Sequence, residues 1–130
     1  MEKPDFSQTA QRACELNIKS RKRGFAELTD DIDAEKLKNH DIFEIGIKLI
    51  SEGLDLEKIN KILTNKISLE QDISLKHLKN IQKEAVLCIH KKYNSWLLIN
   101  ILLSHINEKE TEEAKKQLKS KVFTEYFSMY

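Results

Sequence analysis

Residues 41–67 read DIFEIGIKLISEGLDLEKINKILTNKI and contain two helical patterns on either side of a glycine. In each half, apolar residues recur every three or four positions, which is the spacing of one face of an α-helix. Asp41 and Asp55 stand directly before the two patterns, where an aspartate side chain can accept from free backbone N–H groups. Gly53 suits the position after a helix, where the backbone needs a positive φ. The segment therefore predicts two helices joined by a tight turn.

The same kind of pattern extends toward the N-terminus and is interrupted at Gly24. A first helix is expected to begin near Asp5 or Ser7, since either residue can cap a helix, and to end in a basic turn before Gly24. After an acidic turn, Asp33 is placed to cap a short helix over residues 34–38. This part of the chain therefore predicts one long helix and one short helix.

Three further helices are expected toward the C-terminus. Ser74 can cap a long helix whose polar face is rich in lysine, and Thr111 opens a last helix with an acidic first turn. Between them, Ser95 can cap a helix over residues 96–106, the most apolar run of the chain. Polar residues interrupt this run, and it is shorter than the roughly 20 apolar residues of a membrane span. We therefore expect it to be the central buried helix of the fold.

The composition agrees with one helical domain. The chain has 130 residues with 3 glycines and 1 proline, whereas an all-β fold needs many more turn residues. Apolar residues make up 40% of the chain and charged residues 33%, a balance that suits a folded helical protein. We predict an all-α fold in which residues 1–130 form a single compact bundle of about five to six helices.

Charge and cysteine usage indicate the compartment and narrow the class of partner. The net charge is +1 and the pI about 7.7, whereas a dedicated nucleic-acid binder is usually more basic. The two cysteines, Cys14 and Cys88, fit a reducing compartment and are expected in the core as small hydrophobic residues. No secretory signal is visible at the N-terminus. We expect a cytoplasmic protein, and we do not expect nucleic acid as its partner.

The sequence contains no constellation that predicts catalysis or a cofactor. It has no glycine-rich phosphate loop, nucleophile elbow or HExxH motif. The cluster of Asp30, Asp31 and Asp33 lacks the glycine and the closing glutamate of a calcium loop. Cys88 and His90 would lie roughly 200° apart around a helix, so they do not form a metal pair, and the histidines are expected at the surface. We therefore predict no enzyme, no metal site and no cofactor.

Two features suggest a binding surface instead. The first is the basic end of the first helix together with the acidic turn after it, which is either a solvated face or a charged docking site. The contact residues there would be Arg21, Arg23, Glu27 and Asp30. The second is an aromatic C-terminal end, which either belongs to the core or anchors a partner or a second copy of the chain. Its residues are Phe123, Tyr126, Phe127 and Tyr130.

Three consecutive stretches carry a family resemblance. Residues 20–28 read SRKRGFAEL, a helix end with arginine, a charged pair, glycine and an apolar stretch. Residues 43–55 read FEIGIKLISEGLD, with phenylalanine, glycine, an apolar run and an acidic-glycine turn. Residues 56–67 read LEKINKILTNKI and form the following helix. In their order and spacing, these stretches resemble the cytoplasmic region of MotA-like flagellar stator proteins, whereas residues 74–130 are not assigned to a family.

The resemblance implies a place in the bacterial flagellar motor. In the MotA family, charged residues of this region face the rotor protein FliG, and Arg21 falls on the family's rotor-facing arginine. Thr29 stands at the rotor-facing acidic position and carries no charge, so Glu27 or Asp30 would have to act in its place. The family's two leading membrane spans, and the glycine-rich start of its third span, have no counterpart in the sequence. What is implied is a MotA-like relative without transmembrane helices, which does not conduct ions.

From this resemblance, we expect a non-catalytic, protein-binding adaptor at the stator–rotor periphery. Its partners would be flagellar motor components such as FliG or stator proteins. It would lie in the cytoplasm, either free or at the cytoplasmic face of the inner membrane. A homo-oligomer closed by the terminal aromatic residues stays open.

Two other classes of function also stay open. A helical nucleic-acid-binding or regulatory domain unrelated to motility would use a set of lysines and would lose affinity steeply with salt, although the near-neutral pI counts against it. An enzyme would need a pocket lined by ionisable groups. The lysines in question are Lys76, Lys79, Lys83, Lys91 and Lys92.

Overall fold

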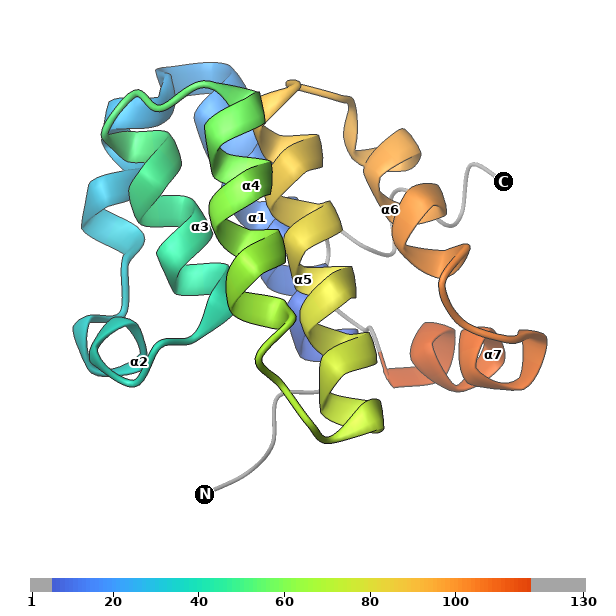
Figure 1. Ribbon diagram of the computed structural model, residues 1–130. Helices are drawn as coiled ribbons and strands as arrows, with labels where there is room; N and C mark the ends of the chain where they lie inside the picture. Colours follow the sequence, from blue (N-terminus) through green and yellow to red (C-terminus); the bar gives the residue numbers. More distant parts are fainter. Residues whose placement is uncertain (1–5, 118–130) are drawn as a thin grey trace.

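The computed structural model describes residues 6–117, and side chains over residues 6–114. Within these ranges the chain forms eight helical elements and no strand, which confirms the all-α prediction. The number is slightly higher than predicted, partly because residues 25–31 form a 3₁₀ helix that the sequence did not predict. The elements in Figure 1 are α1 (Phe6–Arg23), η1 (Phe25–Asp31), α2 (Ala34–Lys38), α3 (Ile42–Ser51), α4 (Leu56–Ile67), α5 (Ile73–His90), α6 (Ser95–Leu103) and α7 (Glu108–Gln117).

Helix α5 occupies the centre of the bundle. It packs against α1, α3, α4 and α6, and Figure 1 shows it between α4 and α6 with α1 behind. Helix α6 covers one side by packing on α1 and α5, and its Trp96 is 38% exposed. The prediction that residues 96–106 form the central buried helix is therefore wrong. The run is apolar around most of its circumference, but the helix is nine residues long and lies at one side of the bundle.

The predicted helix pair and its aspartate caps are confirmed. The Asp41 side chain accepts from the Glu44 amide at 3.0 Å, and that of Asp55 accepts from the Lys58 amide at 2.8 Å. Asp33 caps α2, whose bounds are those that the sequence predicts. The turn between α3 and α4 has Gly53 at φ +86°, as expected for a residue that follows a helix. These elements could be predicted because each cap joins residues only two or three positions apart.

Three other predicted caps are wrong because each of these helices begins earlier. Asp72 caps α5 in place of Ser74, and Asn94 caps α6 in place of Ser95. At α7, the Asn107 side chain accepts from the Glu110 amide, so the helix starts before Thr111. In each case an aspartate or asparagine stood upstream of the chosen hydroxyl, and such residues cap at least as well. Ser7 lies inside α1, and Asp5 falls outside the described residues.

Helices α3 and α5 approach each other closely at Gly46. A Cβ atom on Gly46 would lie 2.5 and 2.7 Å from the two γ-methyl carbons of Val86. Both positions are buried, and a valine in a helix has essentially one χ1 rotamer, so its methyl groups cannot turn away. The glycine therefore sets the distance between α3 and the central helix.

We expect Gly46→Ala to destabilise the protein by about 1–3 kcal/mol, the usual effect of overpacking a core. Urea denaturation of the variant and the wild type measures the difference. In the double variant G46A/V86A the added methyl has room, so part of the loss should be recovered. A G46A protein as stable as the wild type would contradict this account of the α3–α5 contact.

Candidate protein-interaction surface

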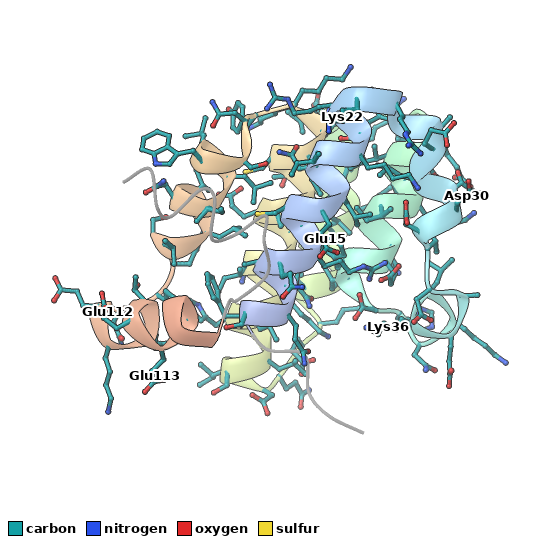
Figure 2. All side chains as sticks on the ribbon, turned by 180° about the vertical axis from the view of Figure 1, so that it is seen from behind. Glu15, Lys22, Asp30, Lys36, Glu112 and Glu113 are labelled. Atoms are coloured by element: carbon teal, nitrogen blue, oxygen red, sulfur yellow. The ribbon has the colours of Figure 1, made fainter. Side chains whose placement is uncertain are left out.

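The last three residues of α1 are cationic. Arg21, Lys22 and Arg23 are all exposed, and Figure 2 shows Lys22 at one end of the bundle. Cations at this place interact favourably with the negative end of the helix dipole. None of the three forms an ion pair within the part of the chain that the structure describes. Two of the predicted contact residues, Arg21 and Arg23, are thus accessible to a partner.

A glycine corner sends the chain from this end down the flank of α1. Gly24 has φ +90°, and its amide donates to the Ser20 carbonyl at 2.8 Å. The following 3₁₀ helix, η1, packs on α1 and α3 and carries Glu27 and Asp30, which are exposed. In Figure 2, Lys22 lies at the end of the bundle and Asp30 on its side. The predicted acidic residues therefore border the basic ones on an adjacent face.

The structure adds two lysines to the basic end. Lys91 and Lys92 follow the last residue of α5 and are exposed. The Lys92 ammonium lies 5.1 Å from the centre of the Phe25 ring, and Phe25 is only two residues after Arg23. The Lys91 ammonium lies 5.6 Å from the centre of the Tyr93 ring. We call the five residues that meet here the cationic end. They are Arg21, Lys22, Arg23, Lys91 and Lys92.

Partly buried polar and aromatic contacts hold the two helix ends together. The Asn17 side chain, which is fully buried in α1, donates to the Tyr93 carbonyl at 2.8 Å. The Phe25 ring stacks on His90 with centroids 5.4 Å apart, and His90 Nε2 lies 3.1 Å from the Leu54 carbonyl. His90 is half-buried by these contacts, so the prediction that the histidines lie at the surface is wrong for it. Its partners are distant in sequence and left no local signal.

A buried ion pair fixes the flank below the cationic end. Glu44 of α3 is fully buried, pairs with Arg12 of α1, and accepts from the Asp33 amide at 3.0 Å. The same arginine donates to the Asp31 carbonyl at 2.8 Å. Burial lowers the pKa of Arg12, against the opposing effect of nearby carboxylates of which Asp41 is the largest. Arg12 thus joins α1, η1 and α3, a role that the sequence did not reveal.

An open groove of about 420 Å³ runs beside α1. Its two cations are already engaged, since Arg12 holds Glu44 and the Lys19 ammonium lies 2.7 Å from an Asp31 carboxylate oxygen. The cationic end therefore offers more uncommitted charge than this groove. The other lining residues are Gln8, Gln11, Glu15 and Leu16.

The lysines of the nucleic-acid alternative do not form one surface. Lys79 pairs with Glu70 at 2.8 Å, and Lys83 donates to the Thr64 hydroxyl at 3.2 Å. Lys76 lies near the start of α5 and Lys91 just after its end, so the helical rise places them roughly 20 Å apart. Lys91 and Lys92 belong with the end of α1 instead.

The remaining sequence predictions concern chemistry and the C-terminus. Both cysteines are buried and unpaired, as predicted, and burial raises the pKa of Cys14 to about 12 and that of Cys88 to about 11. Residues 6–117 contain no group of three side chains able to hold a metal ion, and no helix long and apolar enough to cross a bilayer. The predicted aromatic interface lies outside the described residues. It comprised Phe123, Tyr126, Phe127 and Tyr130.

Comparison with known proteins gives no further guidance. No model of a known protein family matches the chain, and neither a curated protein nor a solved structure matches it.

We expect Arg12→Leu to destabilise the fold by about 3 kcal/mol, because it leaves the Glu44 carboxylate buried without its cation. Urea denaturation measures the change. The double variant R12L/E44L removes both charges and should recover most of the loss. If the double variant is as unstable as the single one, packing around Arg12 matters more than the ion pair.

The carboxyl of Asp41 provides a test of burial through pH. Burial raises its pKa, so the folded state holds the proton more tightly than the unfolded state does. The protonated carboxyl therefore contributes its full share to the free energy of unfolding below the pKa of the unfolded state, about 3.9. This contribution is lost as the pH rises through the pKa of the folded state. Asp41→Asn keeps a capping oxygen without the charge. We expect the melting temperature of D41N, measured relative to that of the wild type, to increase as the pH rises from 4 to 7. A difference that stays constant over this range would contradict this.

Proposed function

We propose that this protein is a non-catalytic interaction module that binds a protein partner through the cationic end. The observation that carries the proposal is that five cations meet on two helix ends with no carboxylate paired to any of them among the described residues. Complementary charge steers association and fixes the orientation of a complex. The partner would present acidic groups to the cationic end and would also border Glu27 and Asp30 of η1.

A purely structural role accounts for only part of this charge. The C-terminus of a helix carries about half a negative elementary charge, so α1 and α5 together supply about one. The cationic end carries five positive charges. The excess has a cost in mutual repulsion, which an acidic partner would relieve.

The resemblance of residues 20–67 to the cytoplasmic region of MotA-like proteins suggests which partner to test. In that family the arginine that corresponds to Arg21 faces FliG, and Arg21 is exposed at the end of α1. We therefore propose an adaptor of the bacterial flagellar motor at the stator–rotor periphery, at the cytoplasmic face of the inner membrane. FliG or the stator proteins would be its partners. This part of the proposal rests on the resemblance alone.

The test is binding of the purified chain to FliG, and separately to the cytoplasmic region of the stator protein, both from the same organism. We expect R21E/R23E to weaken binding about tenfold or more, which corresponds to at least about 1.4 kcal/mol. Isothermal titration calorimetry measures the affinity, and circular dichroism shows whether the variant is folded.

The matched control is K61E/K66E, which makes the same charge change at exposed positions of α4. It should bind like the wild type. Equal affinities of R21E/R23E and the wild type would mean that the cationic end is not the contact. Failure of the wild type to bind any of the motor proteins would remove the motor assignment.

A further inference from the structure

Lys92 holds an unusual backbone conformation at the cationic end. Its φ is +58°, in the left-handed region that residues with a side chain rarely adopt. The two other corners at this end of the bundle use glycine, Gly24 at φ +90° and Gly53 at φ +86°. A lysine therefore stands where a glycine would be free of strain. Such a conformation costs on the order of 1 kcal/mol in a residue with a side chain, and a role for Lys92 has to come from the contacts of its side chain.

The Lys92 side chain is also held in place. Its ammonium lies over the Phe25 ring, and Phe25 in turn stacks on His90. The neighbouring Lys91 ammonium lies against the Tyr93 ring. Contacts of this kind restrict long side chains that would otherwise lose entropy on binding. Two ammonium groups are thus presented beside the arginines of α1 in a partly fixed arrangement.

We propose that the cationic end binds a short acidic peptide segment of its partner, and that Lys91 and Lys92 belong to the contact as fully as Arg21 and Arg23. The inference rests on the proposed function and names the chemistry that its surface recognises. Arginine guanidinium groups bind carboxylates in pairs of parallel hydrogen bonds, and lysines add point charges. Glutamate or aspartate side chains are therefore the fitting ligands.

The borders of the cationic end favour a short peptide over nucleic acid. On one side stand the exposed carboxylates Glu27 and Asp30. On the other side, the turn between α3 and α4 is neutralised by its own pairs, Lys48 with Glu52 and Lys58 with Asp55. A nucleic-acid strand needs a basic track that continues along its phosphates. The basic surface stops on both sides, so it suits a ligand with only a few negative charges.

The experiment measures binding of a fluorescein-labelled polyglutamate peptide to the full chain by fluorescence anisotropy at low salt. We expect K91E/K92E to weaken binding at least about tenfold, as much as R21E/R23E does, whereas K61E/K66E stays within about twofold of the wild type. A single-stranded oligonucleotide of equal charge should bind more weakly than the peptide.

The outcomes separate this inference from the proposed function. If K91E/K92E binds the peptide like the wild type while R21E/R23E binds poorly, the two lysines are not part of the contact, and the contact of the proposed function is reduced to the end of α1. If the wild type does not bind the peptide, or prefers the oligonucleotide, the ligand class is wrong. Binding to FliG then tests the proposed function independently.

A second pair of variants separates recognition from folding. Lys92→Gly removes the side chain and the backbone strain together, so we expect its melting temperature to be at least equal to that of the wild type while its affinity for the peptide falls about threefold or more. The control is His40→Gly, which relieves the other non-glycine residue with a positive φ among the described residues, just after α2. H40G should bind like the wild type. A K92G protein that melts earlier but binds equally well would show a structural role and overturn the assignment of Lys92.

Discussion

The Glu44 carboxylate is fully buried in α3, and the arrangement of the first half of the chain follows from the need to compensate it. Removing a carboxylate from water costs several kcal/mol unless a cation and hydrogen-bond donors replace the solvent. Arg12 supplies the cation from α1, and the Asp33 amide supplies a donor from the segment after η1. Both can reach Glu44 only if the chain turns back after α1 and runs along its flank. The glycine at position 24 permits that turn, and the last turn of α1 is left exposed at the end of the bundle.

The cationic end depends on a second constraint, the attachment of the α5–α6 turn to α1. The Asn17 side chain donates to the carbonyl of Tyr93, 76 positions later, and so joins α1 to the turn after α5. The two cysteines are buried in α1 and α5. The contact places the residues after α5 beside the residues that end α1. Charges from two distant segments then share one surface, and their repulsion persists because neither segment can move away without breaking the hydrogen bond of the buried Asn17 side chain. If the proposed function is right, an acidic ligand would relieve this repulsion.

The sequence was sufficient for most features that depend on neighbours along the chain. The aspartate caps of α2, α3 and α4, the glycine turn and the exposed arginines of α1 all follow from spacing within a few residues. The sequence was not sufficient where two choices lay close together, as with Asp72 and Ser74, because capping strength differs little between them. It could not show Arg12 against Glu44 or Lys92 against Phe25, since these contacts arise only when whole helices pack. For this reason the basic half of the candidate surface was predicted in part, and its lysines were assigned to another function.

The packing also limits how the MotA resemblance can be understood. The resemblance covers residues 20–67, which hold η1 and helices α2, α3 and α4. Both α3 and α4 pack against α5, and η1 packs against α1, so the buried faces of the segment are covered by helices that lie mostly or wholly outside it. The close approach of Gly46 to Val86 crosses that boundary. In this chain the segment therefore depends on packing partners outside its own residues. The part of the segment that does not depend on these partners for cover is the exposed end of α1 with η1, and the lysines after α5 extend that surface.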